Sequence, residues 1–173
     1  GVGKTVTPSH LRLIPDGILD DLIEPTQCGQ RQLAGVDIQK NRLRAVAEAL
    51  LALAPKPGGF TLAELAERVR QLLPGERPYY AARQASYDLS KLRGKALVER
   101  VEHSRRYRVR PYGIRILAGM LVLRERVLKP LLAGLGKPRV GRPPKHIHPI
   151  DQHYHTLQRE LRRTFETLGL ACA

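Results

Sequence analysis

Residues 79–96 carry basic, amide and aromatic side chains at the spacing of one helix face. At 100° per residue, small residues and leucines fall on one side of the predicted helix, and the other side collects Tyr80, Arg83, Gln84, Tyr87, Ser90 and Lys91. All six side chains can donate hydrogen bonds, Arg83 and Lys91 also carry positive charge, and the face contains neither glutamate nor a branched aliphatic residue. The pattern favours a binding face. The alternative is an ordinary solvated helix surface, which usually contains more glutamate.

A second basic group follows this helix directly. Lys95 lies at the end of the helix, and Arg105 and Arg106 stand side by side further along the chain. Two short alternating runs, residues 96–101 and 106–110, lie on either side of residues 102–105 and predict a β-hairpin with a loose tip. We expect the helix face and the hairpin tip to point the same way and to form one cationic surface.

The elements that must position this surface are predicted from hydrophobic periodicity. Helices are expected over residues 11–24, from residue 41 to the Pro/Gly stretch at 54–59, and over residues 61–73 after a Thr61–Glu64 capping box. Residues 24–35 predict a loop. Phe60, just before the capping box, could form a very short strand. Gly94 is expected to be the left-handed residue that ends the basic helix of residues 79–96.

A long helix is expected after the hairpin, with Pro111 in its first turn and Pro130 kinking or ending it. Its apolar residues occupy more than one stripe, so it should bury two faces. The predicted domains are an extension of helix and loop over 1–40, a helix–hairpin domain over 41–135, a basic Pro/Gly-rich linker over 136–150 and an amphipathic helix over 151–173. Residues 114–132 and 151–168 are the expected dimer contacts.

The charge of the chain is concentrated in its second part. Thirty Lys and Arg against 16 Asp and Glu give a formal net charge of +14 at pH 7. Residues 1–76 contain nine of each sign, residues 77–116 contain eleven basic against three acidic, and residues 117–173 contain ten against four. Such a basic region favours a polyanion as the binding partner, because phosphates that are neutralised by Lys and Arg release their counterions. A membrane surface would instead favour a basic amphipathic helix with bulky apolar residues, so nucleic acid is preferred.

The order helix, helix, helix, hairpin, long helix resembles the winged helix-turn-helix domain of bacterial regulators of the MarR, ArsR and PadR-like families. The resemblance is carried by Leu89 and Leu92, by Gly94, by the Leu97-Val98 strand, by Arg105 and Arg106, by Tyr107, and by Pro111 with Gly113. It covers roughly residues 41–135. Arg110 replaces the usual capping threonine, and Ala96 stands where these families commonly have glycine. The region also looks like the C-terminal part of larger uncharacterised bacterial proteins.

The resemblance implies that the helix of residues 79–96, the third of the winged-helix domain, enters the DNA major groove. Arg83, Gln84, Tyr87 and Lys91 would then face bases or phosphates, and Arg105 and Arg106 would reach the adjacent minor groove or backbone. In the linker, Gly141, Arg142 and Pro143 resemble the core of an AT-hook, which lies in the minor groove of A·T-rich DNA. A plain basic linker is the alternative for that segment.

Other motifs favour neither catalysis nor a cofactor. The histidines at 146, 148, 153 and 155 could bind zinc or nickel, but no cysteine is near, and a polar turn is the preferred interpretation. Residues 1–5 resemble the end of a phosphate-binding loop without its preceding strand, and we interpret this as coincidence. We find no Ser/His/Asp spacing and no carboxylate pair in a credible pocket, so we expect no enzyme, no cofactor and no metal.

The sequence therefore predicts a mainly α protein with a small β-hairpin, a winged helix-turn-helix with flanking helices. We expect it to bind double-stranded DNA as a transcriptional regulator or a DNA-targeting module, as a homodimer or within a larger complex. The alternative is a winged-helix module that binds structured RNA or an acidic protein. No apolar run approaches the ~20 residues of a membrane span, and Cys28 and Cys172 suit unpaired thiols in a reducing cytoplasm. Because Gly1 is not methionine, we expect a processed chain or a piece of a longer protein.

Overall fold

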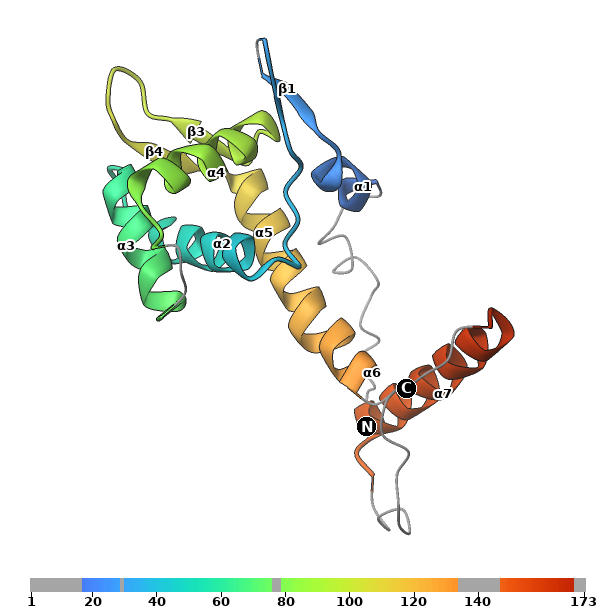
Figure 1. Ribbon diagram of the computed structural model, residues 1–173. Helices are drawn as coiled ribbons and strands as arrows, with labels where there is room; N and C mark the ends of the chain where they lie inside the picture. The colour runs from blue at the N-terminus through green and yellow to red at the C-terminus, as the bar shows by residue number, and fades with distance from the viewer. Residues whose placement is uncertain (1–16, 29, 76–78, 134–146, 170–173) are drawn as a thin grey trace, which may run out of the picture. The chain divides into compact units, whose positions relative to one another are not determined.

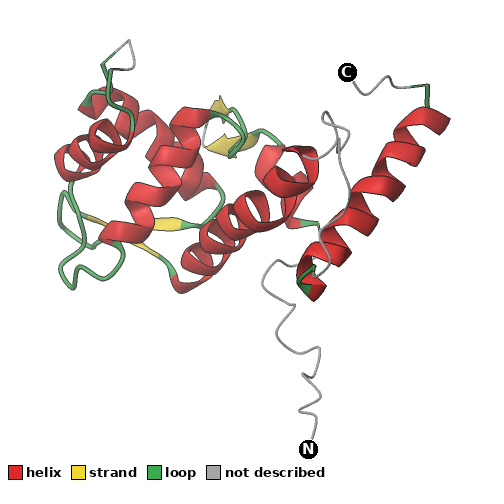
Figure 2. Ribbon diagram, turned by 90° about the horizontal axis from the view of Figure 1, so that it is seen from below, coloured by secondary structure: helices red, strands yellow, loops and turns green. Residues whose placement is uncertain are grey.

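The computed structural model describes residues 17–28, 30–75, 79–133 and 147–169 (Figure 1). It is mainly helical with short antiparallel hairpins (Figure 2), which confirms the fold class predicted from the sequence. The chain forms two compact units, divided between Leu121 and Val122. The first unit contains the predicted basic helix and hairpin. Among the described residues, no helix combines the length and apolar composition needed to cross a bilayer.

Three helices form the core of the first unit. α2 (Asn41–Leu53), α3 (Leu62–Leu72) and α4 (Ala82–Gly94) occur close to the predicted ranges, and α3 packs against both of the others. The almost fully buried side chains of these helices include Leu50, Leu65, Leu89 and Leu92. Since full burial of one leucine contributes about 1.5–3 kcal/mol, these contacts fix the position of α4 on the core.

The predicted hairpin is present after α4. β3 (Val98–Arg100) and β4 (Tyr107–Val109) pair antiparallel, with Val98 opposite Val109. Phe60 adds a one-residue antiparallel bridge to Tyr107, in which each backbone N–H donates to the other residue's carbonyl at 2.8 and 2.7 Å. The β3–β4 hairpin is therefore tied to the segment that leads into α3, and Phe60, where a very short strand was considered, forms this single bridge.

The helix after the hairpin, α5 (Pro111–Leu123), begins at the predicted proline and buries Ile116 and Leu117. Its first turn approaches the start of the hairpin closely. A Cβ atom on Gly113 would lie 2.1 Å from the carbonyl oxygen of Leu97, so only glycine fits without a shift of the backbone.

Pro130 widens the helix instead of ending it. The residues after α5 form a π-helical segment, η2 (Arg124–Leu128), followed by α6 (Lys129–Ala133). Proline lacks an N–H and its ring crowds the carbonyl four residues earlier, which is that of Arg126, and a π-turn accommodates this mismatch. The hydroxyl of Tyr154 donates to the carbonyl oxygen of Arg126. The carbonyl of Arg126, whose usual helical donor at position 130 is a proline, thus accepts a hydrogen bond from the C-terminal helix.

That C-terminal helix, α7 (Pro149–Thr167), begins slightly earlier than predicted. Pro149 occupies its first turn, and Nδ1 of His148 accepts a hydrogen bond from the N–H of Ile150 at 3.3 Å. Its amphipathic character is as expected, but none of the described residues from 122 to 169 is buried. The described part of the second unit therefore has no buried core.

The N-terminal segment corrects the sequence prediction. The described part of the expected first helix is α1 (Ile18–Ile23), and residues 11–16 of that prediction lie outside the described residues. The loop predicted over 24–35 is wrong, because β1 (Thr26–Cys28) and β2 (Arg31–Leu33) form a second hairpin that packs against α4. Three-residue strands are too short to show alternation, and their contact with α4 is a tertiary feature.

The end of α4 differs from the expectation for Gly94. Gly94 is the last helical residue, and the left-handed position falls on Ala96, at φ 56°. Ala96 is the residue that stands where the resembling families commonly have glycine. Left-handed backbone brings an L residue's Cβ close to the following carbonyl oxygen, which strains the chain by about 1–2 kcal/mol.

Ala96→Gly is therefore expected to raise the free energy of unfolding by about 0.5–1 kcal/mol, because relief of this strain exceeds the entropy that glycine adds to the unfolded chain. Urea unfolding measures the change. Ala52→Gly, at an exposed position inside α2, is the matched control, and it should lower the free energy of unfolding by about 0.5–1 kcal/mol. If both variants lowered the free energy of unfolding equally, the backbone at Ala96 would not be strained.

Candidate nucleic-acid interface

The outward side of α4 carries two unpaired arginines. Arg83, Ser86, Tyr87 and Arg93 are exposed, and 46% of the Tyr87 surface is accessible. Arg83 and Arg93 form no hydrogen bond or ion pair with the described residues. They lie roughly 15 Å apart along the helix, at 1.5 Å per residue. Their guanidinium groups are therefore available to an external anion along most of the helix.

Tyr80 is not part of this face, and its predicted place was wrong. It precedes α4, exposes only 6% of its surface, and its hydroxyl donates to the buried carboxylate of Asp88 at 3.0 Å. Arg42 of α2 donates to the other oxygen of the same carboxylate at 3.1 Å. Since α4 begins at Ala82, helical spacing does not extend back to residue 80.

This buried group holds α4 against α2. Burial raises the pKa of the Asp88 carboxyl, and the charge of Arg42 opposes that rise. Burial also raises the pKa of the Tyr80 hydroxyl, and the neighbouring Asp88 charge adds to the shift. We call these three side chains, Arg42, Tyr80 and Asp88, the Asp88 cluster. Their hydrogen bonds support the position of α4 in the site.

Lys91 is also turned away from solvent, against the sequence prediction. It exposes 7% of its surface, and its ammonium lies 4.6 Å from the ring centroid of Tyr87. Burial lowers the pKa of Lys91, and the charge of Asp88 opposes this. Helical spacing alone could not place Lys91, because it does not show which neighbours cover a helix face, and here the charges of Asp88 and Arg42 lie close to the lysine. The Lys91 side chain therefore lies buried beneath the exposed Tyr87 ring.

Three further predicted contacts are engaged within the protein. Oε1 of Gln84 accepts the N–H of Ala81 at 3.0 Å, and the Ser90 hydroxyl donates to the carbonyl of Ser86 at 2.8 Å. Lys95 donates to the carbonyl of Asp21. Gln84, Ser90 and Lys95 are each half-buried, so only part of each side chain faces outward.

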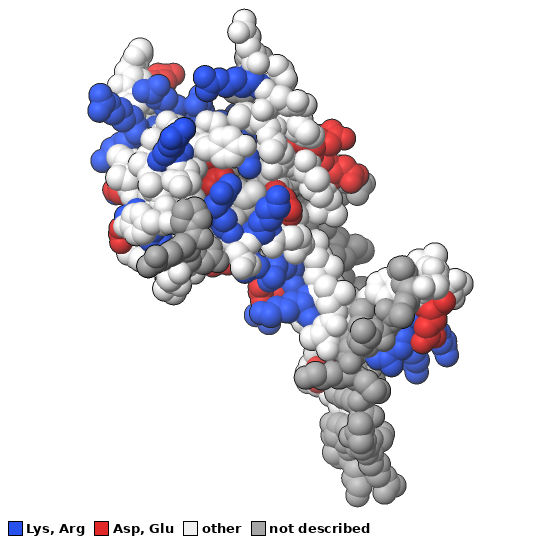
Figure 3. Space-filling model, in the orientation of Figure 1, with Lys and Arg blue, Asp and Glu red and all other residues white. Residues whose placement is uncertain are grey.

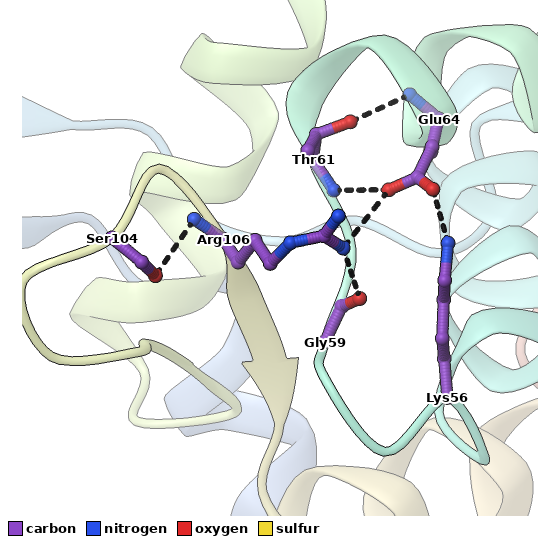
Figure 4. Close-up of polar contacts among 6 residues, drawn as sticks. All are labelled: Lys56, Gly59, Thr61, Glu64, Ser104 and Arg106. Atoms are coloured by element: carbon purple, nitrogen blue, oxygen red, sulfur yellow. Dashed lines mark hydrogen bonds and ion pairs between the residues drawn. The ribbon is translucent and has the colours of Figure 1, made fainter.

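The two hairpin arginines point in different directions, which corrects the expectation that both reach the tip. Arg105 is exposed and forms no hydrogen bond or ion pair with the described residues. Arg106 turns back toward α3, where its guanidinium donates to the carbonyl of Gly59 at 2.9 Å and lies 3.7 Å from the Glu64 carboxylate (Figure 4). Arg106 therefore positions the hairpin, and Arg105 is the arginine available at the tip.

Glu64 links Arg106 of the hairpin to the start of α3. Its carboxylate accepts the N–H of Thr61 at 2.7 Å, and the Thr61 hydroxyl accepts the N–H of Glu64 at 3.2 Å, which confirms the predicted capping box. The hydrogen bond from Lys56, followed by that from the Thr61 N–H, lowers the pKa of Glu64 from 4.5 to about 2. The α3 terminus and the hairpin thus share one charged group (Figure 4).

The lowered pKa predicts an acid-dependent loss of stability. The unfolded chain takes up a proton on Glu64 near pH 4.5 and the folded chain near pH 2, so stability is full above pH 4.5 and is lost as pH falls toward 2. Glu64→Gln keeps a capping-box side chain and should remove this part of the pH dependence of urea unfolding.

Glu48→Gln is the control for this prediction, because Glu48 is exposed on α2 and forms no ion pair with the described residues. It should leave the pH dependence unchanged. If Glu64→Gln keeps the wild-type decline between pH 4.5 and 2, another carboxyl is responsible.

Sequence reasoning missed a groove between α4 and β3. Its volume is about 380 Å³, and its lining includes Ser90, Arg93 and Arg100. Glu99 also lines the groove, but it is paired with Arg108 at 2.7 Å and with Arg110 at 3.4 Å. Arg93 follows Ser90 by one helical turn, so extending the helix count to the end of α4 would have found it. The groove offers two guanidinium groups to an anion.

The basic side chains gather along one edge of the first unit. Figure 3 shows Lys and Arg over the β3–β4 hairpin and α4, with few Asp and Glu among them. Arg142 and the linker segment 136–146 lie outside the described residues. Within the described residues, no group of three or more His, Cys, Asp or Glu could hold a metal ion. Comparisons with protein-family models, with curated proteins and with solved structures found no match to this chain.

Proposed function

We propose that this chain binds double-stranded DNA as a winged helix, with α4 in the major groove and the β3–β4 hairpin on the neighbouring backbone or minor groove. The observation that carries the proposal is the set of exposed arginines on α4 and the hairpin: Arg83, Arg93, Arg100 and Arg105. Its role would be transcriptional regulation, or the targeting of a larger machine to DNA, in the cytoplasm.

The dimensions of the surface suit a duplex. The major groove is about 12 Å wide and admits one helix, and the free arginines of α4 are spread along the helix on one side. A phosphate strand would pass over the groove lined by Arg93 and Arg100, since the backbone lies between a helix in one groove and a hairpin on the next. Arg105 would then reach beyond that strand.

Fluorescence anisotropy on a duplex at two salt concentrations tests the proposal. With four phosphate contacts, the slope of log K against log salt is expected to be about −3.6. A slope near zero, or no binding at low salt, would contradict DNA binding.

Structured RNA is the second candidate partner, favoured by exposed aromatic rings. Tyr79 and Tyr87 expose 68% and 46% of their surfaces, and single-stranded bases stack on such rings. Competition between duplex DNA and a hairpin RNA separates the two. Displacement of duplex by an RNA loop at lower concentration than by unlabelled duplex would favour RNA.

The second unit is proposed to join two copies of the chain. None of its described residues is buried, and Leu132, Leu157 and Leu168 are each more than half exposed. Such exposed apolar residues are typical of interaction surfaces. A second copy would bury them and would give the DNA-bound form the two-fold symmetry common to regulators of this kind.

Sedimentation equilibrium is expected to give about twice the chain mass of 19.4 kDa. Leu157→Asp should return the protein to a monomer, because a buried unpaired charge opposes association. Gln152→Asp, an exposed change on the same helix, should leave the dimer intact. A monomeric wild type would contradict this proposal.

A further inference from the structure

The β1–β2 hairpin is held in a fixed position beside α4. Thr26 lies against Gly94, where an added Cβ would be 3.1 Å from the threonine methyl group. Lys95 binds the carbonyl of Asp21, and the N–H of Val36 donates to the carbonyl of Leu22 at 2.6 Å. Leu33 is buried. These contacts on both sides of the hairpin fix its direction relative to α4.

The outer part of this hairpin has the composition of a nucleic-acid contact. Gln27, Gln30, Arg31 and Gln32 are exposed, and no acidic residue occurs between Pro25 and Val36. Gln27 stands opposite Gln32 across the ladder, so both amides project from one face. Arginine and glutamine are the side chains that bond guanine and adenine edges in pairs of hydrogen bonds, and both also bind phosphate.

The hairpin lies where a duplex on α4 would continue. In Figure 1 the β1–β2 hairpin projects beyond the end of α4 that carries Gly94, and the tip of the β3–β4 hairpin projects toward the same side, further from that end. Figure 3 shows basic side chains along this same edge. A two-stranded ribbon is as well suited to the major groove as a helix is.

We propose that the β1–β2 hairpin is a second DNA-contacting element, which meets the duplex on the far side of α4 from the β3–β4 hairpin. This inference rests on the proposed function. Arg31 would bind a phosphate or a base edge, and Gln32 would bind the same stretch of duplex. If the hairpin served only to cover α4, its contacts through Thr26 and Leu33 would suffice, and the exposed side chains of Arg31 and Gln32, which project from opposite faces of the strand, would not be needed.

The test compares the double variant Arg31→Ala/Gln32→Ala with the matched control Arg68→Ala/Gln71→Ala. The control removes the same two residue types from an exposed site on α3, where Arg68 bonds Gln71 at 3.0 Å. Anisotropy is measured on duplexes of about 12 and about 24 base pairs, roughly one and two helical turns. Thermal unfolding of both variants confirms that they fold.

The hairpin variant is expected to lose about tenfold in affinity on the longer duplex and less on the shorter one, with the salt slope reduced by about 1. The control should bind both duplexes as the wild type does. Equal binding of the longer duplex by the hairpin variant and the wild type would overturn this inference alone. A wild type that binds neither duplex would overturn the proposed function, and this inference with it.

Discussion

The triple variant Arg83→Ala/Arg93→Ala/Arg105→Ala is expected to bind duplex DNA at least about 100-fold more weakly than the wild type at ~0.15 M salt, with a salt slope smaller by nearly three. Each arginine is exposed and has no partner among the described residues, so each is available to a phosphate or a base edge. At about 1 kcal/mol or more for each contact, three contacts give a loss of that size.

A charge-matched control distinguishes direct contacts with DNA from long-range electrostatic attraction. Arg44, Arg68 and Arg163 belong to α2, α3 and α7, and none of them is part of α4 or the β3–β4 hairpin. Changing these three to alanine lowers the net charge equally and should weaken binding only slightly. Equal losses in the two triple variants would show that long-range attraction, and no defined interface, accounts for binding.

Lys91→Gln gives a contrast within α4 itself. Sequence spacing placed Lys91 beside Arg83 on one face, but the structure buries it below Tyr87. Its replacement should therefore act through folding and not through the salt slope, which sets it apart from the exposed arginines.

Local signals in the sequence were sufficient for most of the helical framework. The Thr61–Glu64 capping box, the proline at 111 and the alternating runs of the β3–β4 hairpin each act within a few residues, so their patterns can be read directly. The β1–β2 hairpin could not be read in this way, because its strands of three residues depend on α4, which follows much later in the chain.

The candidate site was less predictable than the fold, for the same physical reason. Periodicity tells which residues share a helix face but not which neighbours cover that face. Arg106 looked like a second tip arginine until the structure paired it with Gly59 and Glu64, which come from a segment 42 or more residues earlier. Tyr80 gave no sign that its hydroxyl would meet Asp88.

Asp88→Ala is expected to lower the free energy of unfolding by about 3–5 kcal/mol, because removing one member of a buried charged group leaves its partners without compensation. Asp88 is fully buried and accepts hydrogen bonds from Tyr80 and Arg42. Alanine would leave the Tyr80 hydroxyl buried without an acceptor and the nearby Lys91 ammonium without a counter-charge. Since small domains are stable by about 5–15 kcal/mol, urea unfolding should register a large shift.

Two milder variants identify the cause of this loss. Tyr80→Phe removes one hydrogen bond to Asp88 and should lose about 1 kcal/mol, and Asp88→Asn keeps an acceptor while avoiding the burial of a charge, so its loss should be much smaller than that of alanine. If alanine is no worse than asparagine, the hydrogen bonds of the Asp88 cluster do not stabilise the fold. The cluster joins α2 to the helix that carries Arg83 and Arg93, so its loss should also weaken duplex binding where the variant is still folded. That reduction should leave the salt slope unchanged, because no phosphate contact is removed.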